Sequence, residues 1–251
     1  MLNAIKEFTD AKLYSIDLLD NYYKDKNKRT GFIVDSYSDL KIKHKLFTGG
    51  MALEFMNEIV LSEKGEKIDF CLIDTVHTNP GEIFDFLMVL PFLKDNAIVV
   101  FHDTSLHIDS YFRYNYNVEC LETKITNCLL MSSIMGQKIL QGNYTGPYFP
   151  NIGGIKINKN TKENVFEIFN LLLIKWSYLL NSEQKCKIMS YFEKYYDKYY
   201  LDYLRNVFFY QESVFSHKEI EQKNTLRITK KIQREIKRII NQIKHICNLF
   251  K

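Results

Sequence analysis

A chain of 251 residues with 46% hydrophobic and 25% charged residues is ordinary for a soluble globular protein of one domain with an appendage, or of two small domains. The net charge of +4 is uneven: residues 218–251 carry +7 and the remainder carries −3, which argues against a general nucleic-acid binder. The five irregularly spaced cysteines, the lack of a signal peptide and the lack of eighteen consecutive apolar residues favour a cytoplasmic protein with free thiols.

The front of the chain predicts short strands that alternate with helices. Residues 12–18 predict a strand that ends near Asp17, and residues 31–34 fit either a helix start or a strand. Residues 45–48 predict a further strand before two glycines, and residues 51–61 have the spacing of a helix.

Two apolar runs, residues 68–73 and 97–101, predict strands that are buried on both faces of a parallel sheet. The segment between them has helical spacing and opens on Pro80. A strand, a helix and a second strand form a right-handed crossover, so both strands end at the same edge of the sheet, where open α/β sheets bind ligands. The polar residues that end the two runs are Asp74 and His77 for the first, and His102 and Asp103 for the second.

The second half of the chain predicts mainly helices. Expected helices cover residues 109–117, 125–140, 165–180, 183–207 and 218–250, and one strand covers residues 151–157. Thr161 is expected to cap the helix over residues 165–180. The predicted organisation is an α/β domain over residues 1–160, a helical region over 161–217 and a basic amphipathic helix over 218–251.

The basic helix has two open interpretations. Its isoleucine stripe and flanking lysines and arginines suit peripheral contact with an anionic membrane surface, which would be the inner face of the cell membrane. The same stripe can instead pack against another helix, including one of a second copy in a homo-oligomer.

The strand that ends in Asp17, the run IDxxH at residues 73–77 and the run VVFHDT at residues 99–104 together resemble the class I S-adenosylmethionine-dependent methyltransferases. Within that class, the chain is most similar to the family that acts on sugars and small hydroxylated metabolites. The resemblance covers roughly residues 5–105 and implies a Rossmann-like sheet. It also implies methyl transfer from S-adenosylmethionine to a hydroxyl group of a sugar or another small molecule.

The resemblance implies a role for each strand-end residue. Asp17 matches the acid that holds the ribose hydroxyls of the cofactor. Asp74 and Asp103, with His102 where the family has an acid, match the ligands of a Mg²⁺-like divalent cation. His77 matches the base that takes the proton from the substrate hydroxyl. Purely structural roles stay open, in which Asp17 caps the following turn and His77 caps the helix that starts at Pro80.

The chain departs from the family at its front. No strand and glycine-rich turn precede Asp17, residues 1–10 have the spacing of the helix that would follow such a turn, and Gly49 and Gly50 come too late to replace it. The fold class expected is therefore α/β, a Rossmann-like sheet that is incomplete at its N-terminal end and is followed by a helical region. Such a sheet has open strand edges, and weak cofactor binding is expected. The alternative function is a non-catalytic remnant that acts as an interaction or membrane-associated module.

Overall fold

The structure of the chain is a computed structural model that describes residues 11–63, 65, 67–75, 77–140 and 151–217. It divides into two compact units, residues 1–202 and residues 203–251. The first unit holds all the described strands, in two sheets. The domain boundaries predicted from the sequence stay a prediction.

The smaller sheet joins two parallel strands, β1 (Leu13–Asp17) and β2 (His44–Thr48). Between them lie a short 3-10 helix, η1 (Phe32–Ser36), and the one-turn helix α2 (Ser38–Lys41). Helix α3 (Ala52–Ser62) follows β2. The predicted strands and the helix after them are confirmed, and the ambiguous residues 31–34 belong to the 3-10 helix and the turn before it.

The larger sheet has four strands in the order β3-β4-β6-β5. Strand β3 (Ile68–Ile73) pairs in parallel with β4 (Leu93–His102), and helix α4 (Gly81–Val89) and the 3-10 helix η2 (Leu90–Phe92) connect them. Strands β6 (Ile152–Lys156) and β5 (Gln137–Leu140) add to β4 in antiparallel pairs. Among the described residues, β3 pairs on one side only, and the two sheets share no ladder, as expected for an interrupted Rossmann-like sheet.

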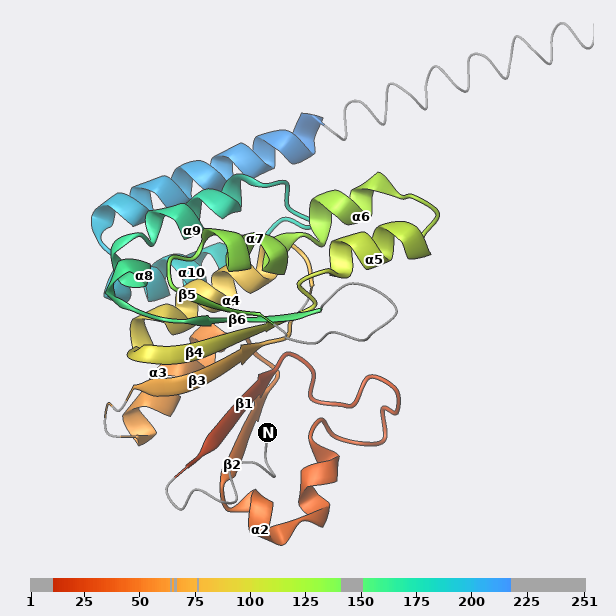
Figure 1. Cartoon of the computed structure of the whole chain (residues 1–251), viewed down its shortest axis with the longest axis vertical. Coiled ribbons are helices and arrows are strands. Elements are labelled where there is room, and N and C mark those ends of the chain that lie inside the picture. Colours follow the sequence, from red (N-terminus) through yellow and green to blue (C-terminus); the bar gives the residue numbers. More distant parts are fainter. Residues whose placement is uncertain (1–10, 64, 66, 76, 141–150, 218–251) are drawn as a thin grey trace, which may run out of the picture. The chain divides into compact units, whose positions relative to one another are not determined.

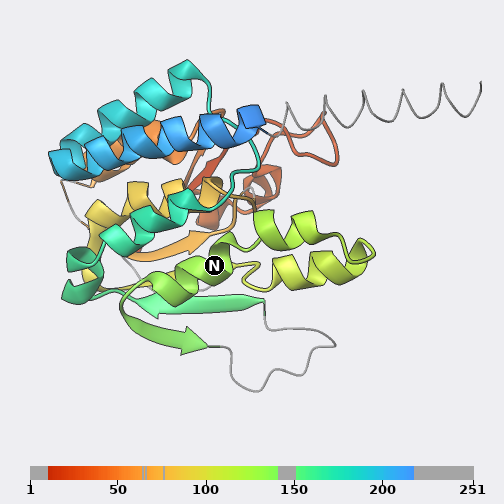
Figure 2. The ribbon, with the colours of Figure 1, turned by 90° about the horizontal axis from the view of Figure 1, so that it is seen from above.

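Helices cover one face of the larger sheet. Helices α4, α7 (Thr126–Ser133), α9 (Phe166–Asn170) and α10 (Ser182–Tyr195) lie on the same side of it in Figures 1 and 2. Seven of the nine residues of α4 are buried, so this helix is the centre of the core. The largest side chains around it that are almost completely buried are Phe86, Phe101, Phe169, Trp176 and Phe192.

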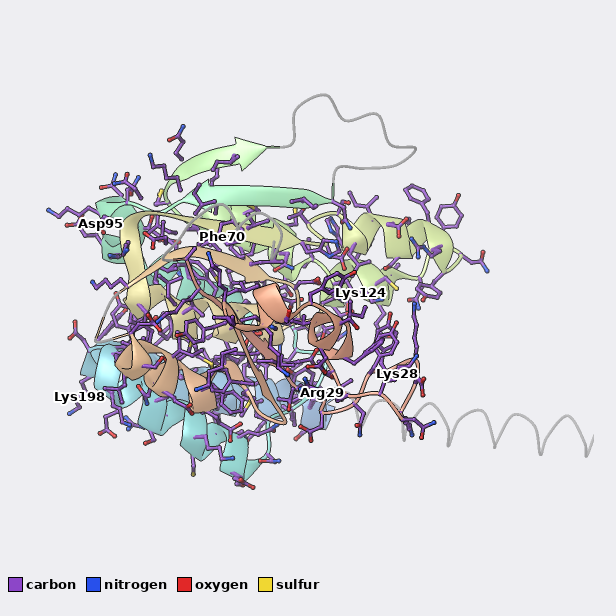
Figure 3. All side chains as sticks on the ribbon, turned by 90° about the horizontal axis from the view of Figure 1, so that it is seen from below. Lys28, Arg29, Phe70, Asp95, Lys124 and Lys198 are labelled. Atoms are coloured by element: carbon purple, nitrogen blue, oxygen red, sulfur yellow. The ribbon has the colours of Figure 1, made fainter. Side chains whose placement is uncertain are left out.

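The opposite face of the larger sheet corrects the prediction that its strands are buried on both sides. Phe70 and Leu72 of β3 are 45% and 40% exposed, and the register places them beside Ile98 and Val100 of β4. Figure 3 labels Phe70 in the view from below, along the edge of the sheet that β3 forms. Over residues 97–102 of β4, buried positions alternate with exposed or half-buried ones, so within the described part of the chain this sheet is well covered on one face only.

The second half of the first unit departs from several predictions. Residues 106–133 form three short helices, α5 (Leu106–Arg113), α6 (Val118–Thr123) and α7, and the strand β5 was not predicted. Asn158, rather than Thr161, caps a short helix α8 (Lys159–Glu163). The predicted helix over 165–180 ends with the 3-10 helix η3 (Leu171–Leu173), and the one over 183–207 is interrupted at residues 196–197.

In the second unit, residues 203–217 are helical. The predicted helix over residues 218–250 lies outside the described residues. Within the described part of the chain, no helix is both long enough and apolar enough to cross a membrane.

Candidate active site at the ends of β3 and β4

The ends of β3 and β4 bring the predicted residues together. The pairing of Ile73 with Phe101 places the residues that follow them, Asp74 and His102, level with each other. Nδ1 of His102 lies 3.3 Å from Oδ1 of Asp74 and 3.3 Å from Oδ1 of Asp103. One ligand atom from each of these three side chains lies within 4.8 Å of the others, so the three can hold a metal ion.

His77 lies against the same carboxylates. Its Nδ1 is 3.2 Å from Oδ2 of Asp103, and its Nε2 is 3.7 Å from Oδ1 of Asp74. The backbone of His77 and that of Asp103 both adopt the left-handed conformation, with φ of 56° and 57°. This conformation is uncommon for residues other than glycine, and it is enriched at functional sites where the surrounding structure enforces it.

Two asparagines from distant segments support the end of β4. The side chain of Asn151 donates a hydrogen bond to Oδ1 of Asp103 and accepts bonds from the backbone N–H and the hydroxyl of Ser105, at 3.2 and 3.0 Å. The side chain of Asn127 donates to the carbonyl of His102 at 2.7 Å. Because these bonds tie the strand end to α7 and to the start of β6, they limit the freedom of Asp103 and His102.

A buried asparagine anchors the loop that carries His77. The side chain of Asn79 donates to the carbonyls of Ile174 and Lys175, at 2.7 and 3.2 Å, and its backbone N–H donates to the carbonyl of Thr123 at 3.1 Å. Asn79 is 1% exposed. Sequence reasoning missed both this residue and Asn151, because their partners are far away along the chain.

Sequence reasoning also missed Glu82. This residue in the first turn of α4 is completely buried, and its Oε1 lies 3.8 Å from Nδ1 of His77. Neither carboxyl oxygen has a well-formed hydrogen bond. Burial, assisted by the nearby carboxylates of Asp85 and Asp103, raises the pKa of Glu82 to about 8, although the backbone N–H groups of Glu82 and His77 oppose the shift. At neutral pH this side chain is therefore mostly a neutral acid.

Asp17 ends β1, as predicted, and is exposed. Its Oδ1 accepts a hydrogen bond from the backbone N–H of Leu19 at 2.8 Å, which is the turn-capping role left open by the sequence. Among the described residues, no hydrogen bond or ion pair links Asp17 to the side chains at the ends of β3 and β4. Its assignment to the cofactor stays a prediction.

The fold and the site together are those of an α/β protein with a Rossmann-like sheet. Its titratable groups lie at the carboxyl ends of the parallel strands. Residues 1–104 match the family model of a methyltransferase domain. The match covers 104 of the 251 residues, so the first part of the chain is similar to a methyltransferase domain. No curated protein matches the chain.

Solved structures similar to this chain include three of one methyltransferase, MycE from the mycinamycin biosynthetic pathway. The first, in complex with Mg, SAH and mycinamycin VI, is 14% identical with a TM-score of 0.37. The two others, in complex with Mg and SAH, are 12% and 11% identical, with TM-scores of 0.35 and 0.34. Each match covers 63% of this chain and 48% of the other, so the matched region is about half the length of these structures.

Proposed function

We propose that this protein transfers a methyl group from S-adenosylmethionine to a hydroxyl group of a sugar or another hydroxylated small molecule. The observation that supports this most strongly is the position of His77 between the carboxylates of Asp74 and Asp103, at the ligand-binding edge of a methyltransferase-like domain. In this proposal His77 is a base that lies beside a pair of acids, which orient the substrate hydroxyl group.

His77 acts as the general base in this proposal. The carboxylate of Asp103 faces its Nδ1 at 3.2 Å and favours a proton on that nitrogen. The neutral imidazole then has Nε2 free to accept the proton of the substrate hydroxyl. As the hydroxyl oxygen bonds to the methyl carbon, the carbon–sulfur bond breaks and its electron pair stays on sulfur. His77 later returns the proton to water.

The residues at the strand ends fit a divalent cation. Nδ1 of His102 is buried without a hydrogen-bond partner and faces oxygens of Asp74 and Asp103. The side chains of Asp74 and His102 are 46% and 39% exposed, which leaves room for water or substrate oxygens. We assign these three side chains as the ligands. A bound cation would lower the pKa of a coordinated hydroxyl and fix its direction.

Cofactor binding is tested by calorimetric titration of the protein with S-adenosylhomocysteine. We expect Asp17→Ala to weaken binding by about 1–3 kcal/mol, the scale of hydrogen bonds to a charged group. The control is Asp69→Ala, which removes an exposed carboxylate within β3. Equal binding by the wild type and Asp17→Ala would exclude Asp17 from the cofactor site.

Catalysis is tested with labelled S-adenosylmethionine, a divalent ion and a panel of sugars and hydroxylated small molecules. We expect His77→Ala to reduce turnover about 10²–10⁴-fold, the usual contribution of a general base. The control His217→Ala removes an exposed histidine from the second unit and should leave turnover unchanged. Unaltered turnover in His77→Ala would reject the proposed base.

A second candidate function is a non-catalytic interaction module. The exposed apolar residues of β3 and its unpaired side, within the described part of the chain, favour it, because open edges and apolar faces attract partners. Residues 218–251 would then serve membrane or homo-oligomer contact. The absence of both cofactor binding and methyl transfer in a folded protein would favour this candidate.

A further inference from the structure

The candidate cation ligands at the ends of β3 and β4 form a mixed set, with carboxylate oxygens from Asp74 and Asp103 and an imidazole nitrogen from His102. The nitrogen lies 3.3 Å from an oxygen of each aspartate. Around an octahedral ion with bonds of about 2.1 Å, neighbouring ligand atoms are roughly 3 Å apart. The spacing therefore suits a single ion bound by all three side chains.

The environment of His102 favours coordination over a purely structural role. Its Nδ1 is buried and has no hydrogen-bond partner, so a hydrogen bond does not account for its position. The bond from Asn127 to the carbonyl of His102 fixes the backbone behind the ring. A contact of His102 with the two aspartates alone is the alternative that needs no ion, and metal titration separates the two.

We infer that this site selects a first-row transition divalent cation, such as Mn²⁺ or Co²⁺, over Mg²⁺. This inference rests on the proposed function, because the same three side chains are the proposed cation ligands. Mg²⁺ prefers oxygen ligands throughout, whereas an imidazole nitrogen suits transition metals, whose affinity for nitrogen donors rises from Mn²⁺ to Co²⁺. His102, the departure from the family pattern, thereby becomes the residue that determines which ion binds.

The test is calorimetric titration of metal-free full-length protein with MnCl₂, CoCl₂ and MgCl₂, supported by the spin-resonance signal of free Mn²⁺ and the visible absorption of bound Co²⁺. We expect Mn²⁺ and Co²⁺ to bind at least about ten-fold more tightly than Mg²⁺. In His102→Asp, which makes the set entirely oxygen, the ratio of Co²⁺ to Mg²⁺ affinity should fall about ten-fold or more.

Controls separate ion selection from loss of structure. His217→Asp makes the same chemical change at an exposed position of the second unit and should keep the wild-type preference. Thermal melting shows whether each variant is folded, and His102→Ala, which adds no charge, provides a second variant that should also lose the preference for Co²⁺.

The outcomes distinguish the inference from the proposed function. Mg²⁺ binding as tight as Mn²⁺ binding, or an unchanged preference in folded His102→Asp and His102→Ala, would overturn the inference and leave the cation site in place. No binding of any of the three ions would overturn the cation site itself. Loss of the Co²⁺ preference in both variants, with the control unchanged, would support His102 as the selecting ligand.

Discussion

At the scale of single residues, Glu82 combines complete burial, two carboxyl oxygens without well-formed hydrogen bonds and contact distance to the proposed base. Its pKa is raised from 4.5 to about 8 in the folded protein. Between these two values the folded state holds a proton that the unfolded state releases. The contribution of protonated Glu82 to the stability of the folded state is therefore fully present below pH 4.5, and it is lost as the pH rises through about 8.

We therefore predict that Glu82→Gln, which resembles the neutral acid, makes stability less dependent on pH. At pH 9 the variant should be more stable than the wild type by about 1–3 kcal/mol, the cost of an unsatisfied buried polar group. At pH 5 the two should differ little. Urea unfolding at both pH values measures this.

The matched control is Glu193→Gln, at an exposed position of α10, which should show the wild-type pH dependence. If Glu82→Gln lost stability equally at pH 5 and pH 9, the carboxyl group would have to be ionised in the fold, and the argument from burial would be wrong.

Much of the candidate site could be predicted, because its residues directly follow two apolar runs. The sequence placed Asp74, His77, His102 and Asp103 at one edge, and the structure brings them together. Glu82 could not be recognised, because an acid in the first turn of a helix is normally a solvated partner of the helix dipole. Asn151 could not be recognised because it reaches Asp103 from the start of β6, the neighbouring strand in the sheet, which is far away along the chain.

At the scale of elements, β3 offers a direct comparison of its two faces. Leu72 is 40% exposed and Ile73 is 3% exposed, although they are neighbours in one strand. We predict that Leu72→Ser costs less than about 1 kcal/mol of unfolding free energy, whereas Ile73→Ser costs about 3 kcal/mol because it removes buried apolar volume. Chemical denaturation of the two variants gives the comparison.

A large cost for Leu72→Ser would contradict the argument that this face of the sheet is uncovered. Gln137→Ser, an exposed change on strand β5 of the same sheet, is the matched control and should be close to neutral.

The helix expected over residues 165–180 was predicted wrongly because contacts with distant parts of the chain outweigh the local spacing of apolar residues. The apolar run after Val165 has helical spacing, yet the chain turns extended at Ile174. There the carbonyls of Ile174 and Lys175 accept hydrogen bonds from Asn79, and the ring N–H of Trp176 donates to Leu172 at 2.9 Å. The two long-range bonds from Asn79, together with the local bond from Trp176, end the helix at a place that periodicity alone does not mark. Strand β5 was not predicted because four residues are too few to show a periodic pattern of apolar residues.

At the scale of the whole molecule, the uneven charge of the chain leads to a prediction about residues 218–251, which carry +7. Each basic side chain gains about 1 kcal/mol near an anionic lipid surface. We predict that the full chain sediments with anionic vesicles at low salt and releases at high salt, and that a chain ending at His217 does not sediment. Neutral vesicles are the control.

Vesicle binding that is equal for the two chains would exclude the tail as the membrane contact. A change in oligomeric state or stability on removal of the tail, without vesicle binding, would instead favour the packing interpretation of its isoleucine stripe.

The one-sided pairing of β3 affects how often this strand opens locally and exchanges its backbone amide hydrogens. Strand β4 is bonded to neighbours on both sides, whereas β3 is bonded only to β4 among the described residues. Backbone amides of β3 should therefore exchange with heavy water sooner than those of β4. A cation bound by Asp74 and Asp103 would link the end of β3 to the end of β4. Ion binding should then slow amide exchange selectively near Ile73, a signature that can be recorded before any substrate is known.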